Sequence, residues 1–270
     1  MKAVIFSGSH KRHLHYNSEL VKHFNEALVI LMQREEELPK TPAELNLVDK
    51  QNFEYHFSTR KKIEDETYGN INYKDVFGEC ELLRLKADEL NTNSLANKIK
   101  KFDADICFIF GTDMIKGAVF KALPNNKINL HLGLSPWYRG SATLFWPFYF
   151  LKPQYAGITF HQIIESPDAG EIIHQSLPQL EYGDGIHDVG IKCVNMAKDD
   201  ARDIIDVFRQ NKKFDGIKQN YNGKLWKVSD FHSSHLRVIY NLFDNKIVDL
   251  YLDGKLGKQV PRLFSCIKNK

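Results

Sequence analysis

The stretch Ile128-Asn-Leu-His-Leu-Gly-Leu-Ser-Pro-Trp-Tyr-Arg-Gly140 combines a strand, a sharp break and two polar groups. Its first residues alternate polar and apolar side chains, which predicts a strand that presents Asn129 and His131 on one face. Gly133 and the Ser135-Pro136 pair end this strand, because glycine and proline interrupt regular backbone. Open α/β sheets place ligands at the carboxyl ends of their strands, so we expect the amide and the imidazole to line a crevice. Taken alone, the pair is also typical of polar residues that are satisfied within a buried strand.

A carboxylate follows downstream between two further predicted strands. Residues 157–161 and 170–174 have the short apolar pattern of strands, and residues 163–167 form the loop that delivers Asp168. Residues 104–110 are an apolar run of the type that parallel sheets bury on both faces.

This order of asparagine, histidine and aspartate, with Tyr138-Arg-Gly140 and Asp168-Ala-Gly170 beside it, resembles the folate-dependent formyltransferase family. Its members include glycinamide ribonucleotide, methionyl-tRNA and sugar-nucleotide amine formyltransferases. The resemblance is strong over residues 104–176 and weaker upstream. The two places after the histidine hold Leu132 and Gly133, where many members carry proline and serine.

The resemblance implies an α/β fold, with a Rossmann-like and mostly parallel sheet flanked by helices. We expect a catalytic domain over residues 1–212 and a small C-terminal α+β appendage over residues 213–270. About 55 residues are few for a separately stable domain, so the appendage is expected to pack on the main domain or on a second subunit of a homodimer. The activity implied is transfer of a formyl group from the co-substrate 10-formyltetrahydrofolate to an amine.

Each step of that reaction needs one type of residue. Asn129 would donate a hydrogen bond to the developing oxyanion, and His131 would stabilise this charge or take the proton from the attacking amine. Asp168 would orient the imidazole and favour its charged form. The resemblance also implies a pocket for the pteridine ring, built by Gly111, Thr112, Asp113, Met114, Ile115, Ser166 and Pro167. Candidates for acceptor binding are Ser9, Lys11, Arg12, Ser135, Trp137 and Arg139.

The acceptor is expected to be a nucleotide-linked amino sugar, as used in polysaccharide biosynthesis, with dTDP, UDP or GDP as the nucleotide. The tail is too short for the barrel domain with which methionyl-tRNA enzymes grip tRNA. Two alternatives stay open: a formyltransferase acting on a non-sugar amine such as a peptide or amino acid, and a catalytically inactive module that binds folate or nucleotide. We expect no metal site, because no Cys, Glu or His stands near His161 or His174 at ligand spacing.

Composition limits the partners. The formal net charge is +3 and the basic residues form no dense stripe, so no nucleic acid is expected. The four scattered cysteines predict a reduced, cytoplasmic protein. The longest apolar stretch, residues 144–151, contains Pro147 and is far shorter than the ~20 residues of a membrane span.

The rest of the chain supplies alternating elements. Strands are expected at 2–6, 27–32, 82–85, 221–228 and 247–252, and helices from Asn17 or Ser18 to Asn25 and at 51–68, 94–101, 141–151, 186–210 and 233–240. Residues 10–15, with three histidines, read as a solvent loop. Lys11 and Arg12 in this loop could meet substrate phosphates. In the helix at 51–68, three basic residues stand four positions before three acids, which is typical of a solvated surface.

Overall fold

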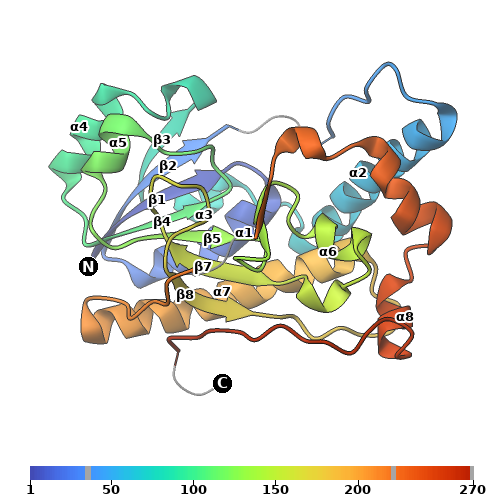
Figure 1. Ribbon diagram of the computed structural model, residues 1–270. Helices are drawn as coiled ribbons and strands as arrows, with labels where there is room; N and C mark the ends of the chain where they lie inside the picture. Colours follow the sequence, from blue (N-terminus) through green and yellow to red (C-terminus); the bar gives the residue numbers. More distant parts are fainter. Residues whose placement is uncertain (34–37, 220–222, 268–270) are drawn as a thin grey trace.

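Seven strands form one sheet in the order β3-β2-β1-β4-β5-β7-β8. The computed structural model describes residues 1–33, 38–219 and 223–267 (Figure 1). Strands β1 to β5 run parallel to one another, and β7 pairs antiparallel with both β5 and β8. The strands are β1 (Lys2–Gly8), β2 (Glu26–Met32), β3 (Glu81–Leu85), β4 (Ile106–Phe110), β5 (Lys127–His131), β7 (Ile158–Gln162) and β8 (Ile172–Ser176). The expected α/β fold with a mostly parallel sheet is confirmed.

The chain changes direction across the sheet between β1 and β4. It runs outward from β1 to β2 and β3, and then returns to the other side of β1 with β4. At this point the carboxyl ends of the two strands come very close. A Cβ at Gly8 would lie 2.5 Å from the carbonyl oxygen of Gly111, so only glycine fits there. Such a switch point opens the crevice in which α/β sheets bind ligands.

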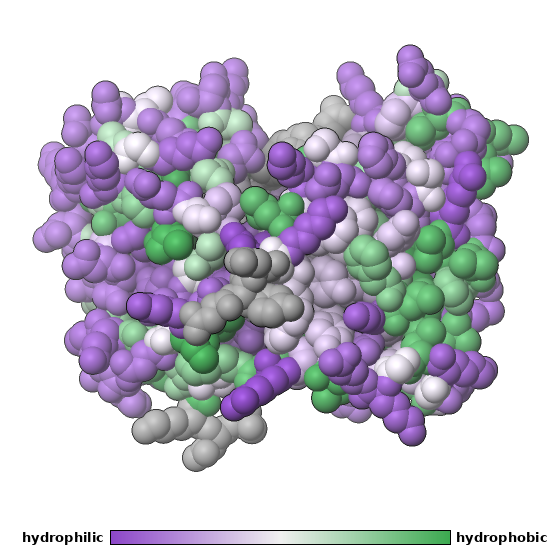
Figure 2. All heavy atoms as spheres, in the orientation of Figure 1, coloured by the Kyte–Doolittle hydropathy of each residue, from purple (hydrophilic) through white to green (hydrophobic). Residues whose placement is uncertain are grey.

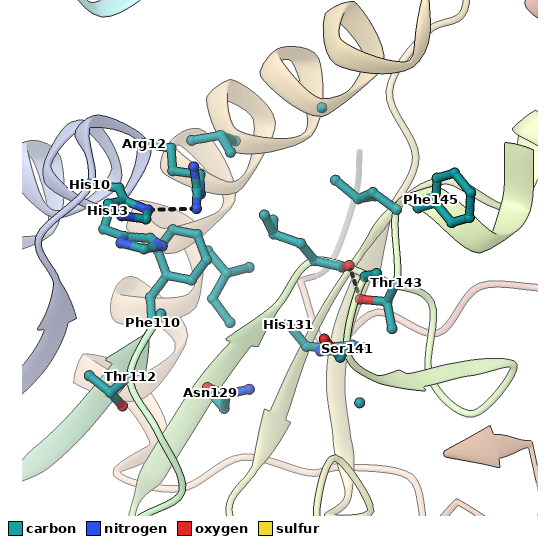
Figure 3. A pocket seen from close by; sticks show the side chains of 18 of the residues that line it. His10, Arg12, His13, Phe110, Thr112, Asn129, His131, Ser141, Thr143 and Phe145 are labelled. Carbon is teal, nitrogen blue, oxygen red and sulfur yellow. Dashed lines mark hydrogen bonds between the residues drawn. The ribbon is translucent and has the colours of Figure 1, made fainter. Parts of the chain in front are cut away.

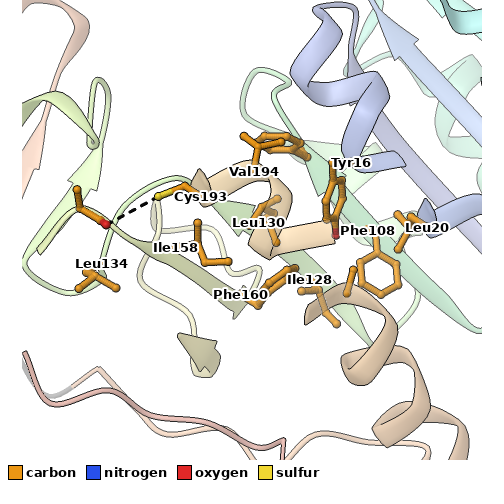
Figure 4. Packing of buried hydrophobic residues seen from close by; sticks show 14 of the residues in the cluster. Tyr16, Leu20, Phe108, Ile128, Leu130, Leu134, Ile158, Phe160, Cys193 and Val194 are labelled. Carbon is orange, nitrogen blue, oxygen red and sulfur yellow. Dashed lines mark hydrogen bonds between the residues drawn. The ribbon is translucent and has the colours of Figure 1, made fainter. Parts of the chain in front are cut away.

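Helices cover both faces of the sheet (Figure 1). One hydrophobic cluster joins the sheet to α1, α2 and α7, and a second joins it to α4 and α5. Figure 4 shows the first, in which Tyr16 of α1 and Val194 of α7 pack with Leu130 and Phe160 from the sheet. The helices are α1 (Lys11–Leu20), α2 (Leu47–Tyr68), α3 (Tyr73–Phe77), α4 (Asn93–Phe102), α5 (Gly117–Ala122), α6 (Phe145–Tyr149), α7 (Ile186–Asn211) and α8 (Ile247–Leu252).

The two long helices begin and end at recognisable caps. The side chain of Asn46 accepts a hydrogen bond from the Asp49 amide at 3.0 Å and starts α2, which ends at Gly69 with φ 60°. Asp188 accepts from the Gly185 amide at 2.8 Å at the start of α7. Lys212, in the left-handed conformation, ends that helix.

The expected solvent loop over residues 10–15 is wrong, because Lys11 already begins α1. The expected helix from Asn17 or Ser18 to Asn25 is displaced for the same reason, and Asn17 is an interior residue whose amide donates to Ser7 Oγ at 2.9 Å. Buried His13, Tyr16 and Leu20 recur at helical spacing. Histidines therefore form part of the buried face, which a pattern that counts them as polar conceals.

The acids of α2 are not simply solvated, which corrects the expectation for this helix. Arg12 donates to both carboxylate oxygens of Glu64, at 2.8 and 3.2 Å, and Glu64 is buried. Lys11 forms an ion pair with Asp65. These pairs join α2 to α1, because Lys11 and Arg12 lie on the side of α1 that faces α2.

Two further elements in the structure differ from those expected from the sequence. Residues 247–252 form α8 instead of a strand, and the adjacent residues Ile247 and Val248 are both fully buried. Adjacent burial fits a helix, since a strand would turn one of the two outward. The helix expected over 141–151 is limited to α6, and Phe150 just after it is 44% exposed.

The part of the chain after residue 212 contacts the main domain at several separate points, on β6, β8 and α2. A short strand, β9 (Lys224–Trp226), pairs with β6 (Tyr138–Gly140). Residues 221 and 222 of the strand expected at 221–228 lie outside the described residues. Isolated bridges join Ile217 to Ile172 and Ser265 to His174. This tail therefore touches both β8 and the loop that follows β5.

Apolar side chains gather on the half of the surface that carries α6 and the C-terminal helices, and the half around α4 and α5 is mainly hydrophilic (Figure 2). Within the described residues, no helix has both the length and the apolar character needed to cross a bilayer. The longest, α7, has only one apolar face.

Candidate active site

A cavity of about 950 Å³ opens at the carboxyl ends of β4 and β5 (Figure 3). Asn129, His131 and Asp168 all line it, so the three polar groups picked out in the sequence meet in one place. β5 supplies the first two, and the loop between β7 and β8 supplies the third.

The imidazole of His131 lies between a backbone carbonyl and a carboxylate. Its Nε2 is 2.9 Å from the Tyr138 carbonyl oxygen, and its Nδ1 is 3.6 Å from Asp168 Oδ2. A carbonyl oxygen only accepts, so Nε2 carries a proton and donates it. The ring is therefore fixed at both ends.

Gly133 leaves the space that this ring occupies. A Cβ there would lie 2.7 Å from His131 Nε2 and 2.6 Å from the Cβ of Thr143. Many family members carry serine at this place. Here, glycine is required because any side chain would collide with the His131 ring in its present position.

Asp168 is held in the left-handed region with φ 47°. Its Oδ2 accepts a hydrogen bond from the Gly140 amide at 2.8 Å, and its carbonyl oxygen accepts from the Gln219 amide group at 2.9 Å. Burial by itself raises the pKa of this carboxyl. The charges of His131 and His161, together with the Gly140 amide, outweigh burial and hold the pKa of Asp168 well below its ordinary value.

His161 is a fourth member of the cluster, and the sequence did not indicate this role. Its Nε2 lies 3.3 Å from Asp168 Oδ1 and 3.2 Å from Asn129 Nδ2, and its Nδ1 donates to the Gln162 carbonyl at 2.8 Å. From the sequence alone, His161 is a candidate only for metal binding, which is not expected here. The signal that could have found it is strand register, because His161 stands directly opposite Asn129 in the β5–β7 pair. Among the described residues, no group of three or more side chains is arranged to hold a metal ion.

The residues predicted for the pteridine pocket lie together along one side of the cavity. They come from the turn after β4 and from the loop before Asp168, and Ile163 and Ile164 add apolar surface. Asn91 fixes the turn, since it donates to the Met114 carbonyl at 3.1 Å and accepts from the Lys116 amide at 2.6 Å. The lining residues in question are Gly111, Thr112, Asp113, Met114, Ile115, Ser166 and Pro167.

Of the residues predicted to bind the acceptor, Arg12 lines the cavity, and Ser9, Lys11, Ser135, Trp137 and Arg139 do not. Ser135 is fully buried beneath the loop. Lys11 is directed to Asp65 and to the Gly69 carbonyl. Arg139 donates to the Pro167 carbonyl at 2.6 Å and so braces the loop that carries Asp168. Trp137 lines a second cavity of about 450 Å³.

Several histidines also line the cavity, including two from the segment that was expected to be a solvent loop. His10 and His13 line the cavity from α1, and His10 Nδ1 accepts from Arg12 at 2.8 Å (Figure 3). His56 of α2 and His187 of α7 have ring centroids 4.4 Å apart. Burial, together with the charge of Arg60, lowers the pKa of His187 to about 3. Burial likewise lowers the pKa of His56, so the His56 and His187 rings add neutral, polar surface to the cavity.

Taken together, the cluster offers an amide donor, two imidazoles and an ionised carboxylate: His161 Nε2 is within 3.3 Å of both Asn129 and Asp168, and His131 Nδ1 is 3.6 Å from Asp168. Such a set can stabilise an oxyanion and move a proton.

Comparison with known proteins agrees with this geometry. The formyl transferase family matches residues 47–214, which is more than half of the chain. A 4-N formyltransferase from Francisella tularensis is 18% identical with a TM-score of 0.56, covering 85% of this chain and 77% of its own. The formyltransferase PseJ from Anoxybacillus kamchatkensis was solved with UDP-4,6-dideoxy-4-formamido-L-AltNAc and tetrahydrofolate. It is 17% identical with a TM-score of 0.50 and covers 93% of this chain and 97% of its own. Phosphoribosylglycinamide formyltransferase from Anaplasma phagocytophilum is 17% identical with a TM-score of 0.53, covering 83% of this chain and 97% of its own. The chain therefore belongs to the formyl transferase family and is a formyl-transferring enzyme.

Proposed function

We propose that this enzyme transfers a formyl group from 10-formyltetrahydrofolate to the amine of a nucleotide-linked amino sugar. The observation that carries this proposal is the convergence of Asn129, His131 and Asp168 at the end of β5, in one cavity. A binding module without turnover would have no need of this arrangement.

The reaction forms a bond between the amine nitrogen and the formyl carbon, and breaks the bond between that carbon and the folate nitrogen. The amine loses a proton and the folate nitrogen gains one. Asn129 donates to the formyl oxygen as it becomes negative, a contact typically worth ~2.7–4 kcal/mol. His131, held beside ionised Asp168, supplies positive charge near this oxygen and, when neutral, takes the amine proton.

The chemistry of the cavity suits the folate. The Gly111–Ile115 turn exposes backbone groups, and Met114, Ile163 and Ile164 give apolar surface against which a flat ring can lie. A volume of about 950 Å³ stands at the upper end of the range for small-molecule sites, which leaves room for an acceptor beside the donor.

The nucleotide-sugar acceptor is supported by the sugar derivative bound to PseJ, a protein of similar fold. The long helix α2 and the segment after residue 212 contribute His56 and Phe231 to the cavity, where they could contact an acceptor. The four cysteines are free thiols, in keeping with a reducing cytoplasm, and polysaccharide biosynthesis would consume the product.

The test is incubation with 10-formyltetrahydrofolate and a panel of UDP-, dTDP- and GDP-linked amino sugars, followed by mass spectrometry. Glycinamide ribonucleotide, an amino acid and a peptide serve as comparison acceptors. Gain of one formyl group by one sugar, and by none of the comparison acceptors, is the expected result. Formylation of a comparison acceptor alone would assign another substrate class, and folate binding without any product would mean an inactive module.

A further inference from the structure

The second cavity lies on the other side of β6 from His131. Its walls are the aromatic rings of Trp137, Tyr138, Phe150, Tyr155 and Trp226. We call it the β6 cavity. Its volume of about 450 Å³ falls within the range of small-molecule sites. None of the residues picked out for the formyl-transfer reaction except Trp137 belongs to it.

The β6 cavity is positively charged. Lys152 and Lys224 line it, and no described lining residue is acidic. The ammonium of Lys224 lies 3.7 Å from the ring centre of Trp226, and that of Lys152 lies 5.9 Å from the ring centre of Tyr155. Both lysines are exposed, so their flexible side chains can turn toward an anion at little cost.

The ring faces differ in what they can offer a ligand. Trp226 is covered by Trp146 on one face, with ring centroids 3.9 Å apart, while the ammonium of Lys224 lies over its ring. Phe150 is 44% exposed, and Trp137 stands edge-on to Tyr155 at 5.7 Å. Partly exposed rings beside ammonium groups are suited to a flat base that carries an anionic group.

We propose that the β6 cavity is a second ligand site, which binds a nucleoside phosphate. The base stacks against Trp137 and Phe150, and the phosphate oxygens meet Lys152 and Lys224. This inference goes beyond the proposed function, because it concerns a cavity separate from the one that holds Asn129, His131 and Asp168.

β6 also connects the two cavities. The ring of Tyr138 lines the β6 cavity, while its carbonyl oxygen accepts from His131 Nε2. Two residues further along, the Gly140 amide donates to Asp168, and the Ser141 amide donates to the Trp226 carbonyl at 2.8 Å. A ligand that shifts Tyr138 or Trp226 therefore changes the hydrogen bonds of His131 and Asp168. We expect occupancy to alter kcat.

The chain offers a selective probe for this site. All three tryptophans, Trp137, Trp146 and Trp226, lie in or directly behind the β6 cavity, and none is among the described residues that line the larger cavity. Tryptophan fluorescence, excited at the red edge of its absorption, is titrated with UDP and separately with tetrahydrofolate. The proteins are the wild type, the double variant Lys152→Gln, Lys224→Gln, and the control Lys255→Gln, whose lysine lines neither cavity.

The expected result is a UDP-dependent change in wild type and control, with the dissociation constant about ten-fold higher in the double variant, equivalent to about 1.4 kcal/mol. An equal dissociation constant in all three proteins, or no response to UDP, overturns the site. A lysine-dependent response to tetrahydrofolate instead of UDP overturns the choice of ligand. The titration needs no formyl transfer, so it stands or fails independently of the proposed function.

A kinetic measurement tests the connection through β6. UDP that competes in the larger cavity raises the KM for the acceptor only, whereas UDP in the β6 cavity changes kcat. We expect UDP to change kcat in the wild type, and the double variant to need about ten-fold more UDP for the same change. A wild-type kcat that UDP leaves unchanged would show that the two cavities are not coupled.

Discussion

Asn129 and His161 face each other across the β5–β7 pair, with Nδ2 and Nε2 3.2 Å apart, and the same Nε2 lies 3.3 Å from Asp168. A proton on Nε2 can be donated to Asp168, and Nε2 without a proton can accept from the Asn129 amide. The protonation of His161 thus decides whether this amide is engaged or is available to a formyl oxygen.

His161→Gln should lower kcat about 10- to 100-fold with little change in KM, as expected for loss of a hydrogen bond to a charged group. The glutamine can restore one of the bonds, so His161→Ala should be slower still. The pH profile of kcat is measured for both variants. Its shape should differ from that of the wild type, because the His161 imidazole is absent. A profile with the wild-type shape would mean that His161 only fills space.

His131→Ala should reduce kcat by about 10²–10⁴-fold, the usual contribution of positioned proton transfer. His232→Gln is the matched control, because His232 is exposed and lines neither cavity. Steady-state kinetics and circular dichroism are measured on both. Turnover near the wild-type rate in His131→Ala would remove this residue from the mechanism.

Asp168→Asn should show at which pH values the carboxylate stabilises the fold. The pKa of Asp168 is lower in the folded state than in the unfolded chain, so its stabilisation is fully present above the unfolded pKa of ~3.9 and is lost as pH falls toward the folded value. The difference in unfolding free energy between wild type and variant, from urea titrations, should be constant near neutral pH and shrink below about pH 4. A difference that grows on acidification would contradict this assignment.

Gly133→Ser should displace the His131 ring, because the added Cβ would meet Nε2 at 2.7 Å. We expect a loss of stability of about 1–3 kcal/mol, as for overpacked sites, together with a lower kcat. Gly257→Ala is the control, since a Cβ there meets no atom within 4 Å. Thermal unfolding and turnover of the two variants are compared. A fully active Gly133→Ser would show that the ring has more space than its contacts indicate.

Arg12 and Lys11 should differ although they are adjacent. Arg12 lines the cavity, and Lys11 is directed to Asp65, so Arg12→Gln should raise the KM for the acceptor and Lys11→Gln should not. Removing Arg12 leaves Glu64 buried without this partner, so the double variant Arg12→Gln, Glu64→Gln separates a loss of binding from a loss of stability. Equal KM values for both single variants would place the acceptor elsewhere.

Much of the fold follows from short-range patterns. Asn129 and His131 share a face because strand geometry alone dictates it, and the apolar run before Gly111 could only be a buried strand. The sequence pattern does not indicate the start of α1, because His13 packs like an apolar ring, edge-on to Phe110 at 4.7 Å. Likewise, residues 247–252 alternate in a way that suits either a strand or a helix, and contacts with the rest of the chain select the helix.

The sequence by itself determined the strands of the main sheet, the family, and the three polar residues Asn129, His131 and Asp168 of the candidate site. Tertiary structure decided which further groups contact these residues and the helices around them. The position of His161 opposite Asn129 depends on the register of two strands 32 residues apart, and the pairing of Glu64 with Arg12 depends on how α2 packs on α1. Local propensity acts over a few residues, whereas register and helix packing are set by burial of the whole core, so these contacts could only be found in the folded chain.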